Sequence, residues 1–235
     1  MPTYMITGAT RGIGRSVAEV LVHDDLILVG RDGDALAQQC ARLPSARPIV
    51  ADLAEPAALR AALAGAELPE HLDGLVHAAG INVNGRLDDL RPEDWTRQVV
   101  VNVVAVAELT RLVLPALRAA RGTVVMVNSG AGRAVKRSGG TAYAASKHAM
   151  VALADGLRME EPELRVTSVF PGRVATDMQR ELRAFEGGEY QEEDYVDPRT
   201  LAQVIAGVLG LADDATINDV AVMPRGPAGR ADRPG

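Results

Sequence analysis

Short apolar runs alternate along the chain with longer segments in which apolar residues recur every three or four positions. The short runs are typical of buried strands, and the longer segments of helices that cover a sheet. The pattern predicts strands at residues 4–6, 26–30, 48–51, 74–78, 122–128, 165–170 and 219–223. It predicts helices at residues 12–22, 33–42, 55–64, 92–119, 141–160 and 198–211. This alternation indicates an α/β, doubly wound, mostly parallel seven-stranded sheet with helices on both faces.

Two segments interrupt the alternation, at residues 130–140 and 171–197. Ligands of such sheets bind beyond the carboxyl ends of the strands, where segments of this kind lie. With 235 residues, 47% of them hydrophobic, the chain is predicted to form one domain over residues 1–224. Residues 225–235 hold no large apolar residue, so we expect them to form a mobile tail.

The formal net charge is −6, and Lys and Arg do not cluster with interleaved aromatic residues. We therefore expect neither a nucleic-acid partner nor a membrane partner. The most apolar stretch, residues 99–107, is short for a membrane span and contains Asn102. The single cysteine, Cys40, cannot form an internal disulfide, and the first strand begins too early for a signal peptide. These observations favour a cytoplasmic protein.

Residues 7–14 read Thr-Gly-Ala-Thr-Arg-Gly-Ile-Gly, between the first predicted strand and the first helix. Glycines at these positions allow close backbone approach, and the amides of the first helical turn then face an anion. A second apolar strand follows about twenty residues later, as in a dinucleotide-binding βαβ unit. The alternative is an ordinary glycine-rich turn, but its context favours a dinucleotide site.

Tyr143 and Lys147 lie four residues apart at the start of a predicted helix, so their side chains share a face. A lysine ammonium near the phenol favours the phenolate and lowers its pKa, so the tyrosine can act as a general acid or base. The alternative is a chance pair on an exposed face. The chain has only two lysines among 25 basic residues, and an arginine fork would not be equivalent here, which favours a specific role.

Two further polar residues occupy places that suit chemistry. Ser129 follows the predicted strand at residues 122–128, so its hydroxyl lies at the carboxyl edge and could hold a substrate oxygen, although it could also begin a turn. Asn102 is surrounded by valines on the long predicted helix. Its amide must therefore be buried with hydrogen-bond partners or take part in chemistry.

Together, residues 7–14, Asn102, Ser129, Tyr143 and Lys147 resemble the short-chain dehydrogenase/reductase family, in its compact single-domain branch with a Rossmann-like fold. The resemblance covers the chain through Pro224. It implies that Tyr143 exchanges the proton, that Lys147 binds the nicotinamide ribose and lowers the tyrosine pKa, that Ser129 holds the substrate oxygen, and that Asn102 anchors a proton-relaying water. It implies these cofactor-binding residues: Gly8, Thr10, Arg11, Gly12, Ile13, Gly14, Arg31, Asp52, Leu53, Ala79, Gly80, Tyr143, Lys147, Pro171, Gly172, Val174 and Thr176. No metal site is predicted.

The chain departs from the family pattern at three places, one of which is the segment from Ser129 to Tyr143, which is one residue longer than the usual pattern. An Asn-Asn-Ala-Gly turn reads His77-Ala78-Ala79-Gly80 here, so a supporting hydrogen bond is either missing or supplied by His77, for which a structural role is the commoner alternative. The glycine-rich segment after the last strand is replaced by Pro224-Arg225-Gly226. This replacement puts the carboxyl-terminal contacts of family tetramers in question.

The end of the second predicted strand indicates the cofactor. NAD-specific sites usually carry an acid there, whereas this chain has Arg31. Arg31, with Arg11 in the glycine loop, could pair with a 2′-phosphate, so we expect NADP(H), with NAD as the alternative. In the family, NADP commonly accompanies carbonyl reduction. Two other functions stay open: a non-catalytic dinucleotide-binding protein and, with less support, a sugar-nucleotide epimerase.

Residues 177–197 hold Phe185, Tyr190 and Tyr195, with a possible hinge at Gly187-Gly188. We expect this segment to close as a lid over the substrate, although Tyr195 could simply anchor the loop before an Asp197-Pro198 helix start. Eight acidic residues against two arginines here favour a small neutral, apolar or cationic carbonyl or alcohol over an anion. The long predicted helices resemble the family's paired-helix dimer surface, which implies a homo-oligomer, dimer or tetramer.

Overall fold

The computed structural model describes residues 1–225 and contains one seven-stranded, all-parallel sheet in the order β3-β2-β1-β4-β5-β6-β7. The strands are β1 (Thr3–Thr7), β2 (Asp25–Gly30), β3 (Ala46–Val50), β4 (Gly74–His77), β5 (Thr123–Val127), β6 (Arg165–Pro171) and β7 (Asp219–Val222). The α-helices are α1 (Gly12–Val20), α2 (Gly33–Cys40), α3 (Pro56–Ala64), α4 (Pro92–Val99), α5 (Ala105–Ala120), α6 (Thr141–Glu160), α7 (Asp177–Phe185) and α8 (Pro198–Leu209). All seven predicted strands are confirmed to within two residues at either end.

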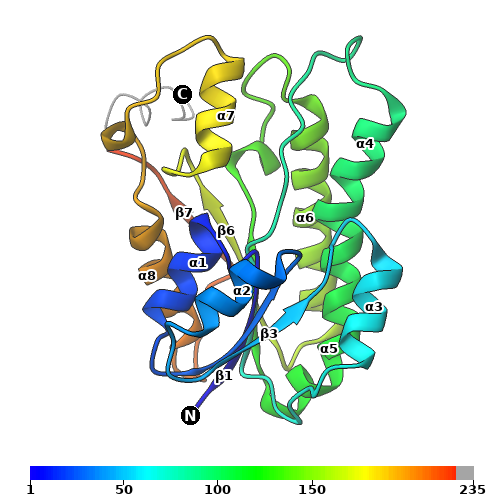
Figure 1. Cartoon of the computed structure of the whole chain (residues 1–235), viewed down its shortest axis with the longest axis vertical. Coiled ribbons are helices and arrows are strands. Elements are labelled where there is room, and N and C mark those ends of the chain that lie inside the picture. Colours follow the sequence, from blue (N-terminus) through cyan, green and yellow to red (C-terminus); the bar gives the residue numbers. More distant parts are fainter. Residues whose placement is uncertain (226–235) are drawn as a thin grey trace.

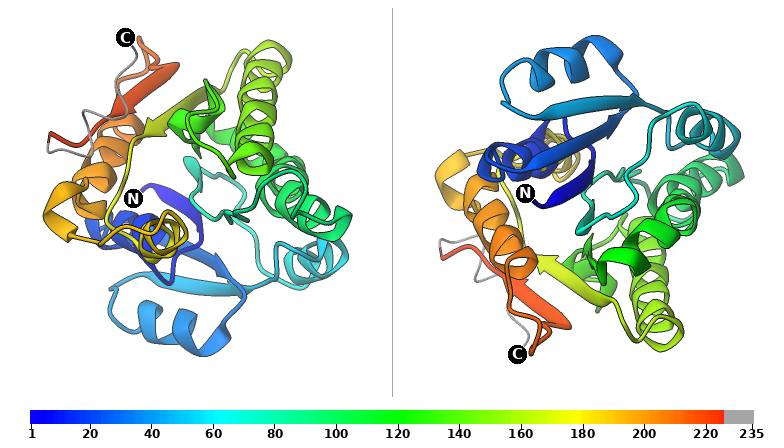
Figure 2. Two further views of the ribbon diagram at one scale, coloured as in Figure 1. Left: turned by 90° about the horizontal axis from the view of Figure 1, so that it is seen from above. Right: turned by 90° about the horizontal axis from the view of Figure 1, so that it is seen from below.

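Helices cover both faces of this sheet, as Figures 1 and 2 show. On one face, α1, α2 and α8 pack through residues such as Val17, Leu36 and Ile205. On the other, α3, α5 and α6 pack through residues such as Leu59, Leu109 and Met150. Because both faces are covered, the central strands are buried along almost their whole length, and the predicted doubly wound, Rossmann-like class is confirmed.

The chain reverses its winding direction at β1, which pairs with β2 on one side and β4 on the other. Thr7 at the end of β1 lies opposite both Val29 of β2 and His77 of β4. The loops that follow neighbouring strands part at such a reversal and leave room for a ligand beyond their carboxyl ends. The candidate site lies there.

The structure differs from the predicted helices at two places. The segment predicted as one helix over residues 92–119 consists of α4, one π-helical turn at Val100–Val104 and α5. Helix α7 was not predicted at all, and it lies in the segment expected to be a loop. Both differences occur beside the candidate site.

Helical residues Pro92–Ala120 are long and apolar enough to cross a membrane by length and composition alone. Val106, Leu109, Val113 and Leu117 of this stretch are nevertheless buried in the core against the sheet. A core helix passes the same test, so this stretch is weak support for a span. The tail predicted at residues 225–235 lies, apart from Arg225, outside the described residues.

Candidate active site

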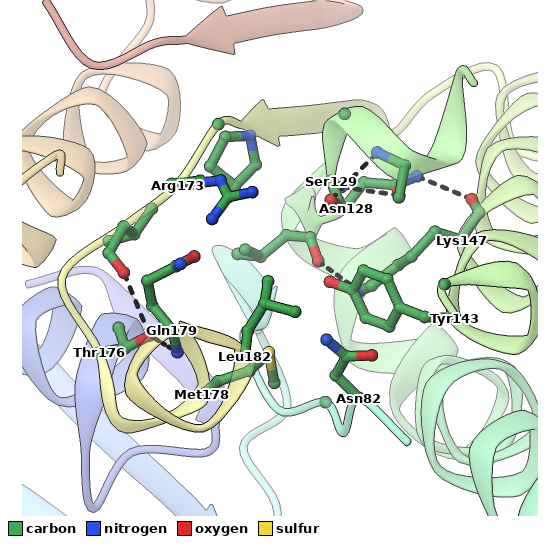
Figure 3. Close-up of a pocket in the computed structure, with 18 of the residues that line it drawn as sticks. Asn82, Asn128, Ser129, Tyr143, Lys147, Arg173, Thr176, Met178, Gln179 and Leu182 are labelled. Carbon is green, nitrogen blue, oxygen red and sulfur yellow. Dashed lines mark hydrogen bonds between the residues drawn. The ribbon is translucent and has the colours of Figure 1, made fainter. Parts of the chain in front are cut away.

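A cavity of about 270 Å³ opens beyond the carboxyl ends of the central strands, as Figure 3 shows. One wall comes from β5, the following turn and α6, and the other from the end of β6 and α7. The structure brings these predicted site residues to the cavity lining: Ile13, Ala79, Gly80, Ser129, Tyr143, Lys147, Pro171, Gly172, Val174 and Thr176. The predicted catalytic and nicotinamide-binding groups therefore surround one space, except for Asn102.

The glycine loop packs tightly against the loop after β4. Gly8 has a φ of +68°, and a Cβ there would lie 2.9 Å from the Cα of Ala79. Gly14 lies in the first turn of α1 against Gly8, where a side chain would meet the carbonyl oxygen of Gly8. Gly12 has a φ of +53° and faces the methyl group of Thr176. Only glycine fits this arrangement, which leaves the first amides of α1 open to an anion.

Thr7 supports the loop after β4. Its hydroxyl accepts hydrogen bonds from the amides of Ala78 and Ala79, each at 3.1 Å. His77 points to the opposite side, where its Nε2 lies 2.9 Å from the hydroxyl of Thr110 on α5. Burial and the nearby charge of Lys147 lower the pKa of His77 to about 3. The neutral ring therefore has a structural position outside the cavity.

Two amides of the α4–α5 stretch hold residues 81–83 in place. The Asn102 side chain accepts from the amide of Ile81 and donates to its carbonyl oxygen, both at 2.9 Å. Gln98 accepts from the amide of Val83 at 2.7 Å and also donates to Ile81. Because Asn102 sits in the π-helical turn, its side chain is set apart from the regular α-helical face.

The same amide of Asn102 reaches the catalytic helix. Its Nδ2 donates to the hydroxyl of Ser146 at 3.0 Å, and that hydroxyl donates to the carbonyl oxygen of Tyr143 at 2.8 Å. Asn102 is buried and does not line the cavity. In this structure its side chain is saturated by protein groups and fixes the position of Tyr143 through α6.

Tyr143 and Lys147 lie on one face of α6, as the spacing predicted. The Lys147 ammonium is 5.7 Å from the centre of the Tyr143 ring and donates to the carbonyl oxygen of Val127 at 3.0 Å. Burial lowers the pKa of Lys147 to about 8. Burial raises the pKa of the Tyr143 phenol, while a hydrogen bond with Ser129 and the charge of Arg137 act against this rise. The opposing cation is Arg137, whereas the sequence pointed to Lys147.

Ser129 follows β5 and caps the short 3₁₀ turn at Gly130–Gly132, where its hydroxyl accepts from the amide of Ala131 at 3.1 Å. The sequence left open whether Ser129 begins a turn or faces the substrate. The two roles are compatible, because the hydroxyl that caps the turn also forms a hydrogen bond with the Tyr143 phenol. Asn128 anchors the strand end by donating to the carbonyl oxygen of Lys147. The three catalytic candidates at the cavity form one connected group.

The opposite wall holds residues that the sequence analysis missed. Helix α7 begins after Thr176, whose hydroxyl accepts from the amide of Gln179, and it places Met178, Gln179 and Leu182 in the lining. A signal existed: Thr176 with Gln179 three residues later is a helix-start pattern, and Met178, Leu182 and Phe185 recur at helical spacing.

Two amides of the lining have unsatisfied atoms. Asn82 Oδ1 and Gln179 Nε2 are buried and have no hydrogen-bond partner among the described residues. Gln179 is 6% exposed, and Figure 3 shows both amides pointing into the cavity. Unpaired buried polar atoms are costly, so these two atoms mark places where a ligand would bind.

The aromatic residues expected to close on the substrate lie outside the cavity lining in this structure. Tyr190 and Tyr195 stack on each other with ring centres 5.0 Å apart, and Phe185 is half exposed and lies against Gly139. None of the three lines the cavity. Asp197 caps α8 before Pro198, so the predicted helix start is confirmed.

The acidic residues of 177–197 also lie outside the lining. Glu186 pairs with Arg173 at 2.9 Å and with Arg183 at 2.7 Å, and Glu192 pairs with Arg180. The excess of acidic residues in 177–197 therefore does not make the cavity acidic. Whether the segment moves as a lid stays a prediction.

Of the residues expected near the adenosine end, Arg31, Asp52 and Leu53 follow the ends of β2 and β3, and Arg11 lies in the glycine loop after β1. Arg31 is exposed, and Arg11 is exposed with Asp177 at 3.6 Å. Asp52 accepts from the amide of Ala54, and Leu53 packs against the core. Both arginines are therefore accessible to a ligand, since exposed ion pairs are weak.

Known proteins resemble this chain in sequence and structure. The family model described as short chain dehydrogenase matches residues 2–187. A dehydrogenase/reductase SDR family member 7B of Bos taurus is 32% identical over 225 residues, covering 87% of this chain and 68% of that protein. An uncharacterised short-chain type dehydrogenase/reductase of Sinorhizobium fredii is 30% identical over 230 residues, covering 94% of this chain and 91% of that protein. The solved structure of a short-chain dehydrogenase from Sphingobium yanoikuyae in complex with NADPH has a TM-score of 0.80 at 26% identity. The match covers 94% of this chain and 87% of that chain.

Proposed function

Because the chain belongs to the short-chain dehydrogenase/reductase family of oxidoreductases, we propose that it interconverts a carbonyl compound and a secondary alcohol with NADP(H) as the cofactor. The observation that carries this proposal is that Ser129, Tyr143 and Lys147 meet at one cavity beyond the strand ends. Tyr143 is the general acid or base, and Ser129 shares the substrate oxygen with it.

The residues present suit a dinucleotide. The glycine loop leaves no room for a Cβ at Gly8 or Gly14, and helix α1 starts there, which suits a pyrophosphate. Asn82 and Gln179 have unpaired buried atoms that polar groups of a cofactor or substrate would satisfy. When bound, the nicotinamide supplies or accepts the hydride. Lys147 would hold its ribose, and residues 171–176 its carboxamide side.

The protonation state of Tyr143 suits the role of acid that reduction of a carbonyl requires. Burial raises the pKa of its phenol, so the group carries its proton at neutral pH. A protonated phenol can donate to the oxygen of a carbonyl as that oxygen gains negative charge. Ser129, already hydrogen-bonded to the phenol, holds the same oxygen in position.

Turnover tests this function against the non-catalytic alternative and against an epimerase, which would cause no net oxidation of NADPH. We expect NADPH absorbance to fall with at least one member of a panel of aldehydes and ketones. Tyr143→Phe should lower kcat by about two orders of magnitude or more and leave NADPH affinity unchanged. Tyr195→Phe is the matched control, since Tyr195 stacks outside the cavity. Near-normal turnover in Tyr143→Phe contradicts the assignment.

The preference for NADP over NAD rests on Arg31 and Arg11 and on the missing acid after β2. Both arginines are exposed at the end of the site where a 2′-phosphate would lie, and the Sphingobium relative was solved with NADPH. Arg31→Asp should weaken NADPH about 10-fold or more and change NADH affinity little. Equal affinity of the unchanged protein for NADH and NADPH at one salt concentration would exclude the preference.

Further expectations join this proposal. We expect a homo-oligomer built on α4, α5 and α6, where Val99 and Val104 expose apolar surface, and a cytoplasmic location. Sedimentation velocity tests the first: a purely monomeric protein at micromolar concentration would contradict it. The acidic residues of 177–197 lie outside the cavity lining, so they do not determine the charge of the substrate.

A further inference from the structure

The lining of the cavity holds basic side chains and no acid, although the chain as a whole is acidic. Among the described residues that line it, four are basic, Lys136, Arg137, Lys147 and Arg173, and none is an aspartate or glutamate. The chain as a whole has a net charge of −6. A cavity lined by one sign of charge favours a ligand of the other sign.

Arg137 differs from the other arginines that are at least partly buried. Within residues 1–225, four arginines share this degree of burial and each forms an ion pair with a carboxylate: Arg158, Arg165, Arg173 and Arg183. Arg137 is buried to a similar degree, but no carboxylate of the described chain lies within ion-pair distance of it. Burying a guanidinium without an anion is unfavourable, so this position needs a reason.

Neutral groups hold Arg137 in place. Its guanidinium donates to the side-chain oxygen of Asn84 and, at 3.4 Å, to the carbonyl oxygen of Ser138. Its stem lies against the backbone of Gly140, and it lies 5.9 Å from the centre of the Phe185 ring. A guanidinium has five N–H groups, so this one is oriented by the protein and can still donate to a ligand.

The ligand that suits Arg137 is the substrate. Arg137 lies in the segment between Ser129 and Tyr143, whereas the glycine loop contacts Ala79 and Thr176. The charge of Arg137 acts directly on the Tyr143 phenol. Glu186, Arg173 and Tyr143 are the other charged or titratable groups that act on Arg137, and Glu186 is already bonded to two arginines.

We propose that Arg137 binds the carboxylate of the substrate, so that the preferred substrate is an oxo acid or the matching hydroxy acid. This inference rests on the proposed function and adds the chemical class of its substrate. The carbonyl faces Tyr143 and Ser129, and the carboxylate accepts hydrogen bonds from the free N–H groups of Arg137. Charge-assisted hydrogen bonds of this kind select strongly against a neutral analogue.

Matched acids and esters test the proposal. Acetoacetate, levulinate and phenylglyoxylate are each compared with their methyl esters, by kcat/KM with NADPH. We expect the protein to prefer at least one acid over its ester, and Arg137→Met to lower that ratio about 10- to 100-fold. Arg137→Lys should keep part of the preference. Arg42→Met is the matched control, since Arg42 is exposed and lies outside the cavity, and it should leave the ratio unchanged.

The ratio separates a role in substrate binding from an effect on Tyr143, because a change at the phenol alters acid and ester alike. Equal kcat/KM for every acid and its ester, or a ratio unchanged in Arg137→Met, overturns the proposal while the oxidoreductase function stands. If the protein prefers dihydroxyacetone phosphate over all three acids, the anion that it recognises is a phosphate, and the carboxylate proposal is also overturned. If no carbonyl compound is reduced, the proposed function fails. Calorimetry of levulinate with the NADPH-loaded protein then decides: binding lost in Arg137→Met supports the anion site, and equal binding or none refutes it.

Discussion

Behind the α6 wall of the cavity, the buried side chains of Asn102 and Lys147 are bonded to protein groups, whereas two amides on α7 and the loop facing it have atoms without a partner. Asn102 makes three hydrogen bonds, to Ile81 and Ser146, and Lys147 donates to the carbonyl oxygen of Val127. Gln179 Nε2 and Asn82 Oδ1 have no partner in the described residues. Groups that must hold a geometry are bonded in advance, and groups that must hold a ligand keep their bonding capacity.

The difference also shows in how each wall is attached. Tyr143 and Lys147 are carried by a 20-residue helix that packs on the sheet. Helix α7 has nine residues and is fastened through ion pairs such as that of Glu186 with Arg173, before Gly187 with its φ of +70°. A rigid wall suits proton transfer and a lightly attached wall suits ligand entry. The following changes test this contrast, beginning with the largest effect.

Asn102→Ala should destabilise the protein by about 2 to 3 kcal/mol, because the buried amide of Ile81 and the hydroxyl of Ser146 lose their partner. Thermal or denaturant unfolding measures this loss. Asn82→Ala is the matched control and should cost under about 1 kcal/mol, because its Oδ1 has no partner to lose. Equal losses in the two variants would remove the contrast between the walls.

His77, which is buried against Thr110 of α5, should make the unfolding free energy of the protein depend on pH. Its pKa is lowered from 6.5 to about 3, so at intermediate pH the unfolded chain binds a proton that the folded chain does not. The associated stabilisation is complete above pH 6.5 and is lost as the pH falls towards 3. His77→Gln should therefore remove about 2 kcal/mol of the loss in unfolding free energy between about pH 7 and pH 5. Identical pH profiles for the His77→Gln variant and the unchanged protein would contradict the burial effect.

Gln179→Leu should separate binding from stability on the α7 wall. Removing an unpartnered buried amide should change the unfolding free energy by less than about 1 kcal/mol, while NADPH affinity falls about 5- to 10-fold. Fluorescence titration and thermal unfolding on one preparation give both values. A large loss of stability with unchanged affinity would make Gln179 a structural residue like Asn102.

Limited proteolysis near Gly187 should show the smallest effect. If α7 and the following residues close over the cavity, NADPH with substrate should slow cleavage there about two- to threefold. Cleavage elsewhere in the chain is the internal control. Equal rates with and without ligands would exclude closure of this segment.

Hydrophobic periodicity located all seven strands and six helical segments. Strands buried on both faces need continuous apolar runs, and the helices that cover them need an apolar residue every three or four positions. The Tyr143-Lys147 pair and the glycine loop were also readable, since both depend on spacing within one element or one turn. Helix α7 carried a start signal at Thr176 and Gln179 that the surrounding charges and glycines obscured.

The partners across the cavity could not be read from spacing. Asn102 bonds Ile81 and Ser146, and Glu186 pairs with Arg173, and each of these pairs joins residues of different elements or loops. Arg137 rather than Lys147 opposes the rise in the Tyr143 pKa, although Arg137 lies in the loop before α6 and shares no helical spacing with Tyr143. Local sequence determines which elements form, because backbone preference and periodic burial act over a few residues. The charge of the cavity depends on which side chains point inward and which acids are already paired, and only the packed chain decides that.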